Sequence, residues 1–396
     1  MGGFRCFTAG WPLNQRRTVS SILDGEAGKR EKGELRLMNP PSAVLSASGS
    51  GQQKQSGVRE QFSLEELAVV LSHFEIGTVE SVQEYARGSR KAPKLLIASE
   101  QGRFLLKRRA RGRDDPFKVA FTHAIQLHLA NKQFPLPHLI GTKLDNNSMF
   151  QWRGQVYELF EYIPGQGFAH TAEASFDAGH TLALFHKLLA DFTTQYQPPT
   201  GSYHAAQVIE QGLQMLQGNL LSAGGQDLRE LGDCLAQSYG EASKAVEAEG
   251  IGRWPRRICH ADWHPGNMLY RDNRVVAVID YDSCRLLAPV VDVANGALQF
   301  SVIYGDGDVS TWPENIDEKR YLQFLAGYEE ITILSEAEIR AIPWLMIEAL
   351  IAEAVLPIAA TGTFGKVEGV PFLHMVQRKL KWMQDNRKRL SDIASG

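Results

Sequence analysis

Few cysteines, little net charge and no long uncharged apolar stretch characterise this 396-residue sequence. Its four cysteines show neither a disulfide-framework spacing nor a Cys-x-x-Cys pair, which excludes a disulfide-stapled secreted domain and favours a reducing, cytoplasmic compartment. The net charge of −3 supplies no general basic field, so nucleic acid is not an expected partner. The longest apolar segment, residues 342–360, contains Glu348 and Glu353, so we expect a buried helix and no membrane span.

Residues 1–60 mix Gly, Ser, Pro, Arg and Gln, a composition that cannot bury enough apolar surface to form a core. We expect a disordered N-terminal extension here. It contains no continuous apolar segment of the kind that a secretory signal has. Met38 is an alternative start position, and the sequence does not decide between the two.

The rest of the chain divides into two parts with different periodicity. Residues 61–165 begin with a helix capping signal at Ser63 and Glu66 and contain short strand-like runs and one helix, at 116–132. The strand-like runs are residues 78–86, 93–99, 103–108, 139–143, 149–152 and 155–163. Residues 166–396 are mostly helical in pattern. The helix-like segments are residues 176–196, 205–216, 227–249, 318–329, 335–356 and 371–390. The predicted fold class is α+β, a small antiparallel-sheet lobe that ends in a connector at 162–165, followed by a larger helical lobe.

The most informative spacing of polar residues joins Asp262, Asn267 and Asp280. Asn267 follows Asp262 by five positions, and Asp280 ends an apolar run 13 positions further on. Between them, a Pro-Gly turn and the runs within residues 268–279 predict a β-hairpin. Such a hairpin returns Asp280 to the side of the other two residues, so three oxygen-bearing side chains converge.

This arrangement suits phosphoryl transfer from ATP, as in protein kinases. One carboxylate, that of Asp262, orients the attacking hydroxyl. The oxygens of Asn267 and Asp280 hold Mg²⁺ against the phosphates, and hard oxygen ligands are those that Mg²⁺ prefers.

Two other interpretations of the segment remain open. Cys259, His260, Asp262 and His264 are crowded potential metal ligands that would suit a zinc-dependent hydrolase, although no second His or Cys pair has the required spacing. The second interpretation is that the segment has a purely structural role, although burying a carboxylate without a partner costs free energy.

A candidate phosphate-binding lysine lies in the sheet part. The run Phe104-Leu-Leu-Lys107 places an amine in an apolar strand, where a fixed anion such as the ATP phosphates is expected nearby. The alternative is that Lys107 only begins a solvated basic run that ends at Arg113. The downstream carboxylates favour the phosphate lysine, and we expect the arginines behind it to lie at the surface.

Two further segments complete the predicted nucleotide site. Residues 87–91, which include Ser89, lie between two predicted strands and offer backbone N–H groups to the phosphates, without the Gly-x-Gly-x-x-Gly of protein kinases. Main-chain groups of residues 158–163, among them Glu161 and Ile163, would face adenine at the connector. An ordinary apolar strand is the competing interpretation of that segment.

Together these residues resemble the aminoglycoside phosphotransferase and choline kinase-like family, small-molecule kinases with a protein-kinase-like, two-lobed fold. The resemblance covers roughly residues 75–300. Residues 260–267 are similar to the family's catalytic loop and residues 279–282 to its metal-binding segment. Residues 184–186 and 289–294 resemble motifs with a structural role in the large lobe. The His-Arg-Asp, Asp-Phe-Gly and Ala-Pro-Glu motifs of protein kinases are absent, which favours the small-molecule branch.

The resemblance implies an ATP- and Mg²⁺-dependent phosphotransferase that acts on a hydroxyl of a small metabolite. In it Asp262 is the base, Lys107 the phosphate lysine, and His260 braces the loop. The implied metal ligands are Asn267, Asp280 and Asp282.

One departure from the family pattern concerns the partner of the lysine. The family places a glutamate on the helix after the lysine strand, whereas this helix offers His123 or Gln126. A neutral imidazole or amide orients Lys107 by a hydrogen bond only, not by charge. The departure motivates an alternative, a nucleotide-binding pseudokinase or scaffold with little or no activity.

The sequence does not identify the acceptor or the oligomeric state. Candidate liners of the acceptor pocket are Glu348, Glu353, Trp344 and Trp312. The two acids suit a cationic amine, although acids on helices are more often solvated. Homoserine, choline, an amino sugar and a glycated amine are all compatible with the sequence.

Overall fold

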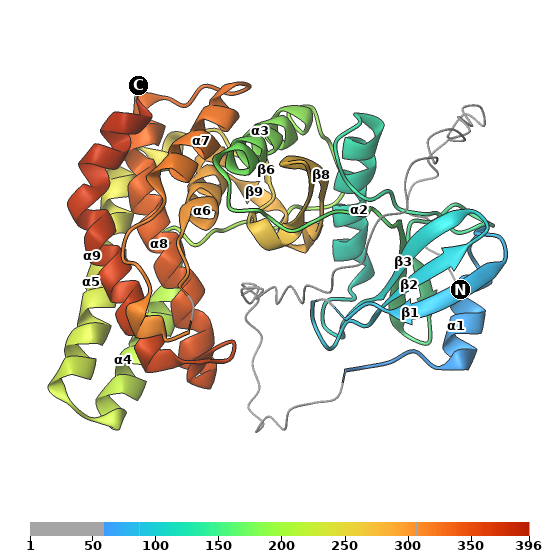
Figure 1. The fold of residues 1–396 in the computed structure, drawn as a ribbon, viewed down its shortest axis with the longest axis horizontal. Helices are drawn as coiled ribbons and strands as arrows, with labels where there is room; N and C mark the ends of the chain where they lie inside the picture. Colours follow the sequence, from blue (N-terminus) through green and yellow to red (C-terminus); the bar gives the residue numbers. More distant parts are fainter. Residues whose placement is uncertain (1–58, 87, 306, 396) are drawn as a thin grey trace, which may run out of the picture.

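The structure, a computed structural model, describes residues 59–86, 88–305 and 307–395. A β-sheet lies at one end of the molecule and a group of long helices at the other (Figure 1). All but the last two residues of the predicted N-terminal extension, 1–60, lie outside the described residues, as does Met38. The predicted lobe boundary at residue 165 stays a prediction.

Within the described residues, five antiparallel strands form the large sheet, in the order β1-β2-β3-β5-β4. They are β1 (Val79–Glu84), β2 (Lys94–Ser99), β3 (Gly102–Arg108), β4 (Phe150–Trp152) and β5 (Gln155–Glu161). The register places Lys107 between Lys94 on β2 and Glu158 on β5. Directly paired residues project from the same face, so these three charged side chains form one row across the sheet.

Two helices pack against this sheet, α1 (Leu64–Leu71) and α2 (Pro116–Asn131). α1 begins with the predicted capping box, and its Val70 joins a core with alternate residues of β3 such as Leu106. α2 begins at an Asp115 cap followed by proline, and its Val119 packs with Val156 of β5.

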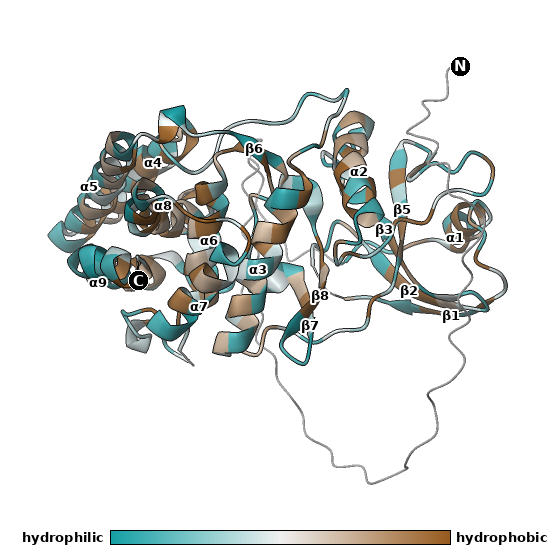
Figure 2. Ribbon diagram, turned by 90° about the horizontal axis from the view of Figure 1, so that it is seen from above, coloured by the Kyte–Doolittle hydropathy of each residue, from teal (hydrophilic) through white to brown (hydrophobic). Residues whose placement is uncertain are grey.

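The helical part holds the largest core. Its helices are α3 (Ala172–Leu188), α4 (Gln207–Ala223), α5 (Gln226–Glu249), α6 (Pro289–Ser301), α7 (Glu318–Glu329), α8 (Glu336–Thr361) and α9 (Gly369–Ala394). α8 lies among α4, α5, α6 and α9 (Figure 2). Among the described helices, it alone is long and apolar enough to cross a membrane, but 78% of its most apolar window is buried in the protein. The prediction of a buried helix here is confirmed.

Four short strands between the two parts carry the predicted catalytic segment. They are β6 (Arg257–Cys259), β7 (Met268–Arg271), β8 (Arg274–Val278) and β9 (Arg285–Leu287). β7 and β8 form the predicted hairpin, and β6 pairs with β9. The loops 260–267 and 279–284 therefore both run between these two strand pairs.

Several element boundaries differ from the predictions. Residues 139–143 make isolated bridges, such as Leu139 to Phe160, in place of a strand. α3 ends at Leu188 and not at 196, and α6 was not predicted as a helix. α8 continues beyond Pro357 and ends where Gly362 adopts a left-handed conformation, φ 73°, a common helix C-terminus.

Candidate active site

Asp262 and Asn267 contact each other in the loop between β6 and β7. Nδ2 of Asn267 donates to Oδ2 of Asp262 at 2.9 Å and to its carbonyl oxygen at 3.0 Å. The N–H of Ile279 donates to the carbonyl oxygen of Asn267 at 2.9 Å. That bond anchors the residue before Asp280, whose side chain is exposed and whose φ is 66°. The hairpin thus brings the three predicted residues to one place.

The environment of Asp262 favours its ionised form. Nε2 of His264 lies 3.6 Å from Oδ1 of Asp262. Burial alone would raise the pKa of this carboxyl, but the contacts with His264 and Asn267 outweigh burial and lower it. At neutral pH, Asp262 is therefore a carboxylate that can accept a proton.

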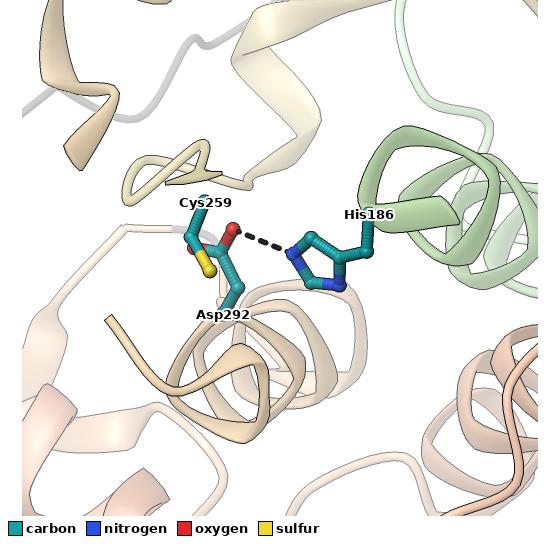
Figure 3. Close-up of side chains that lie close together, drawn as sticks. All are labelled: His186, Cys259 and Asp292. Atoms are coloured by element: carbon teal, nitrogen blue, oxygen red, sulfur yellow. Dashed lines mark hydrogen bonds and ion pairs between the residues drawn. The ribbon is translucent and has the colours of Figure 1, made fainter. Parts of the chain in front are cut away.

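Asp292 of α6 supports the predicted catalytic loop, residues 260–267. Its Oδ2 and Oδ1 atoms accept the backbone N–H groups of His260 at 2.7 Å and Ala261 at 2.8 Å. His186 of α3 lies 3.3 Å from the same carboxylate, and Cys259 is beside it (Figure 3). Because both oxygens of Asp292 accept backbone bonds, we interpret this buried cluster as a support for the loop.

His260 packs inside the protein. Its buried ring lies 5.3 Å from that of Trp263 and 5.4 Å from that of Tyr281, and burial lowers its pKa. Among the described residues, the one cluster of three potential metal-ligand atoms is that of His186, Cys259 and Asp292. The zinc interpretation, built on His260, Asp262 and His264, therefore has no geometric support.

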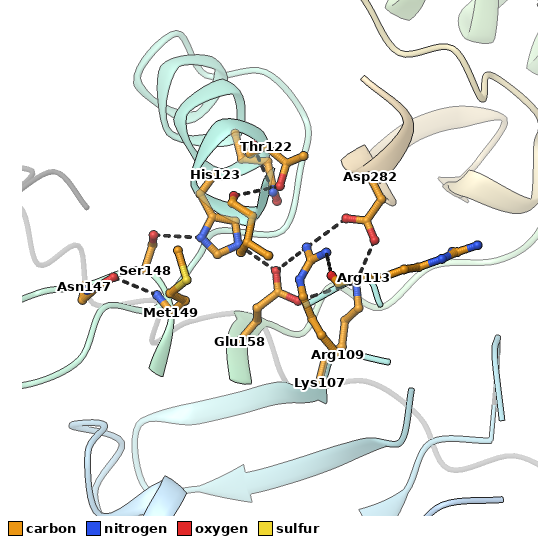
Figure 4. Close-up of polar contacts among 12 residues, drawn as sticks. Lys107, Arg109, Arg113, Thr122, His123, Asn147, Ser148, Met149, Glu158 and Asp282 are labelled. Atoms are coloured by element: carbon orange, nitrogen blue, oxygen red, sulfur yellow. Dashed lines mark hydrogen bonds and ion pairs between the residues drawn. The ribbon is translucent and has the colours of Figure 1, made fainter. Parts of the chain in front are cut away.

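The predicted phosphate lysine belongs to a buried ionic network (Figure 4). Nζ of Lys107 lies 3.6 Å from Glu158 and 3.8 Å from Asp282. Nη2 of Arg109 lies 2.8 Å from each of the same two carboxylates. Nε2 of His123 lies 2.7 Å from Oε1 of Glu158. The network joins β3, β5 and α2 to the segment that follows Asp280.

The charges in the network balance. Burial alone would raise the pKa of Glu158, but Arg109 and Lys107 hold it well below its ordinary value. Burial alone would lower the pKa of Lys107, but the charges of Asp282 and Glu158 outweigh burial and raise it. Burial lowers the pKa of His123, so its ring is neutral at neutral pH. Two cations thus face the carboxylates of Glu158 and Asp282.

The glutamate that α2 lacks has a counterpart on β5. Glu158 gives Lys107 a negatively charged partner, while His123 contacts Glu158. Gln126 donates to the carbonyl oxygen of Thr122 within α2. The sequence contained a signal for Glu158, since it is an acid flanked by apolar residues in a strand, the same feature that identified Lys107.

The prediction that the arginines after Lys107 lie at the surface is wrong for Arg108, whose side chain is 12% exposed and pairs with Glu66, and for Arg109. The side chain of Arg109 is only 5% exposed and lies between two carboxylates. Residues 107 and 109 project from the same side of the chain, because side chains alternate along an extended segment. Arg109 therefore points to the same carboxylates as Lys107.

The remaining predicted nucleotide contacts lie at the two ends of the sheet part. Ser89 is exposed in the loop between β1 and β2, and its Oγ accepts the N–H of Lys91 at 3.2 Å. The N–H of Glu161 donates to the carbonyl oxygen of His138 at 2.9 Å. Ile163, half-buried, follows in the connector. Their contacts with a nucleotide stay predictions.

The two acids of α8 have different surroundings. Glu348 is fully buried and accepts bonds from Ser243, from His204 at 2.8 Å and from the N–H of Ala205 at 3.2 Å. The prediction that it lines an acceptor pocket is therefore wrong.

Glu353 is half-buried and accepts a bond from Nε2 of Gln299 at 2.6 Å. Burial raises its pKa, and the charges of His264 and Asp262 are close enough to affect it. Of the two acids, Glu353 is the one beside the catalytic loop.

The two predicted tryptophan liners also differ. The ring of Trp344 lies under the guanidinium of Arg387, 5.2 Å away. Trp312 packs against Tyr304, with ring centroids 5.5 Å apart. Because the charge of Glu353 also affects the pKa of Tyr304, the Tyr304–Trp312 pair lies toward the Glu353 side of the site.

Known proteins share this fold. An aminoglycoside phosphotransferase from Alicyclobacillus acidocaldarius matches with a TM-score of 0.64 and 17% identity, over 86% of this chain and 98% of that one. A microcompartment-associated aminopropanol kinase matches with a TM-score of 0.62 and 13% identity, over 83% and 99%. The predicted protein-kinase-like α+β fold is confirmed.

Sequence relatives are kinases of a small metabolite. The homoserine kinase of Phenylobacterium zucineum is 26% identical over 291 residues, which span 71% of this chain and 80% of the relative. That of Xanthobacter autotrophicus is 27% identical over 290 residues, with the same coverage. The model of the phosphotransferase enzyme family matches residues 81–341, which is more than half of the chain. This protein therefore belongs to the phosphotransferase enzyme family.

Proposed function

We propose that this protein transfers the terminal phosphoryl group of ATP, with Mg²⁺, to a hydroxyl of a small amine-bearing metabolite. The observation that carries the proposal is the convergence of Asn267, Asp280 and the ionised Asp262 near Lys107, which is half-buried. The charge of Asp280 contributes to the raised pKa of Lys107, so the metal segment and the lysine lie close together. Phosphoryl transfer needs such a combination of base, metal ligands and phosphate-binding cation.

The residues present fit a divalent cation and a nucleotide. Asn267 and the exposed carboxylate of Asp280 supply hard oxygen donors, with Asp282 next to them. When bound, Mg²⁺ neutralises charge on the phosphates. A structurally similar amicoumacin kinase, with a TM-score of 0.60 and 14% identity, was solved with AMP-PNP and Ca²⁺, which supports this assignment.

The chain's own groups account for the transfer step. The carboxylate of Asp262 accepts the proton of the acceptor hydroxyl, whose oxygen forms a bond to the γ-phosphorus as the bond from phosphorus to the ADP oxygen breaks. Asn267 holds that carboxylate in place through its 2.9 Å bond. Lys107, paired with Glu158, orients the phosphates.

An amine on the acceptor is supported by Glu353. Its carboxylate lies on the catalytic-loop side of α8, and burial makes its negative charge costly without a cation. The relatives named homoserine kinase and the structural neighbour named aminopropanol kinase have amino alcohols in their names. An amino alcohol or amino sugar with its hydroxyl at Asp262 and its ammonium at Glu353 fits both points.

The alternative of a catalytically inactive nucleotide-binding protein rested on the missing helix glutamate. Glu158 provides the charge that α2 lacks, which supports an active enzyme. The test is ADP release from Mg²⁺-ATP across a panel of amino alcohols and amino sugars, with Asp262→Ala and Asp280→Ala as controls. We expect one compound to stimulate release, and both variants to lose the stimulation while remaining folded. No stimulation together with ATP binding would instead favour the pseudokinase.

A further inference from the structure

A second lysine lies directly beside Lys107 on the same face of the sheet. The register of β2 and β3 pairs Lys94 with Lys107, which is paired on its other side with Glu158. Side chains of directly paired residues start about 5 Å apart and project from one face. Lys94 thus extends the charged row of the candidate active site by one position.

The ammonium group of Lys94 lies under the loop between β1 and β2. A Cβ atom on Gly88 would be 2.6 Å from Nζ of Lys94, so the glycine permits the amine to approach the loop backbone. Gly88 has φ +81°, a conformation that other residues rarely adopt. The base of the loop is closed by a bond from the N–H of Tyr85 to the carbonyl oxygen of Lys94, at 2.9 Å.

This loop is held in shape by Arg59, which precedes α1. Its guanidinium donates to the carbonyl oxygens of Ala86 at 2.9 Å and Ser89 at 3.2 Å, and lies 3.3 Å from Glu84. The carbonyl groups of Ala86 and Ser89 are therefore directed to Arg59. Lys94 lies against this loop at Gly88 and in one row with Lys107.

Two ammonium groups side by side repel each other, and negative charges near them offset that repulsion. Like charges opposite each other on neighbouring strands destabilise a sheet. Burial, followed by the charge of Lys107, lowers the pKa of Lys94 to about 8, and the charges of Asp280 and Asp282 oppose that change only in part. A polyphosphate, with several negative charges, is the ligand chemistry that suits such a pair.

We infer that Lys94 and Lys107 form a two-lysine site for the phosphates of a nucleoside polyphosphate, with Lys94 binding them from beneath the β1–β2 loop. The inference rests on the proposed function for the identity of the nucleotide. It adds a second cation, supplied by β2, to the phosphate lysine on β3.

Binding of ATP, ADP and adenosine to the full chain, measured by calorimetry with Mg²⁺, tests this site. For Lys94→Met we expect the affinity for ATP and ADP to fall at least about tenfold, as for a lost charge-assisted contact. The affinity for adenosine should not change. The melting temperature without nucleotide, measured alongside, shows whether the variant is folded.

Two other variants complete the test. Lys143→Met removes one exposed positive charge elsewhere and should bind ATP like the wild type. Lys94→Arg keeps the charge and should recover part of the affinity for ATP. If Lys94→Met does not fold, Lys94→Arg becomes the deciding variant. Complete loss of ATP binding in Lys94→Arg would then count against the site. ATP affinity of Lys94→Met within twofold of the wild type overturns the inference.

The outcomes separate this inference from the proposed function. A wild type that binds ATP but transfers no phosphate refutes the function and leaves the Lys94 comparison valid. A wild type that binds adenosine, ADP and ATP equally well overturns the two-lysine site, whatever its catalytic activity.

Discussion

Nζ of Lys107 lies 3.6 Å from Oε2 of Glu158, its directly paired neighbour on β5. The negatively charged partner of this lysine thus belongs to the same sheet, and strand register fixes their separation. Helix α2 contributes His123, which contacts Glu158 and holds it from the other side. The lysine is therefore oriented by the sheet itself, and not by an acid on a helix.

Replacing Glu158 by Gln should impair both stability and catalysis. The variant keeps the shape of the side chain but leaves Lys107 and Arg109 with Asp282 as the remaining carboxylate in the network. Removing one partner of a buried ion pair typically costs about 3–5 kcal/mol. We expect a lower melting temperature and a kcat/KM for ATP reduced at least about tenfold, measured by thermal denaturation and by ADP release.

The matched variant is His123→Gln, which removes a neutral ring from the same network. Its effect should be smaller in both measurements, because the ion pairs of Glu158 persist. Equal losses in the two variants would mean that the charge of Glu158 is not what orients Lys107.

The sequence revealed contacts that are local in the chain and missed those that depend on strand register. Asp262, Asn267 and Asp280 are joined by one short hairpin, so their convergence followed from turn and strand signals. Glu158 lies 51 positions after Lys107, and its pairing requires the order β3-β5 in the sheet, which periodicity does not encode. The burial of Arg109 was missed for the same reason, since its two carboxylates come from distant segments.

Variants of the proposed metal ligands and variants of the ionic network should differ in how much Mg²⁺ they require for activity. Asp280 is exposed, whereas Asp282 also contacts Arg109 at 2.8 Å. We expect Asp280→Asn to raise the Mg²⁺ concentration for half-maximal activity by about tenfold or more, and Asp282→Asn to raise it less. Chelation of the metal should abolish wild-type activity, and added Mg²⁺ should restore it.

Arg109→Met is the control for Asp282, because it breaks the same contact and keeps the carboxylate. It should lower the melting temperature without changing the Mg²⁺ requirement. If Asp282→Asn also left that requirement unchanged, Asp282 would be a structural partner of Arg109 and not a metal ligand.

An amine subsite at Glu353 predicts a selective effect on the acceptor. Glu353→Gln should raise the KM for an amino alcohol substrate at least about tenfold, as for the loss of a charged hydrogen bond. The KM for ATP should not change. The same variant should make little difference to the reaction of an analogue that lacks the amine, and an equal loss with both compounds would argue against the subsite.

His204 should make stability depend on pH. Burial alone would lower its pKa, but hydrogen bonds to Glu348 and Glu247 outweigh burial and raise it. A raised pKa means that the folded protein holds this proton more tightly, so the stabilisation is complete below about pH 6.5, the ordinary histidine value. It is lost as the pH rises through the higher, folded-state value.

Urea denaturation between pH 6 and 9 measures this effect. The wild type should lose stability over that interval to a greater extent than His204→Gln, whose side chain does not titrate. His180→Gln, at an exposed histidine, should follow the wild type. Parallel curves for the wild type and His204→Gln would show that the His204 proton does not contribute.

The packing of α3 against α7 depends on two glycines that face each other's helix. A Cβ atom on Gly179 would overlap the carbonyl oxygen of Phe324, and one on Gly327 would overlap that of Phe176. Gly179→Ala must therefore separate the two helices, and it should destabilise the protein by about 1–3 kcal/mol.

Gly218→Ala, within α4 and facing open space, should instead be neutral or stabilising by up to about 1 kcal/mol, because alanine favours helices. Urea denaturation compares the two variants directly, and a gain of stability in both would mean that helix propensity outweighs packing at these positions. Since α3 also carries His186, which contacts Asp292 behind the catalytic loop, Gly179→Ala should reduce activity as well.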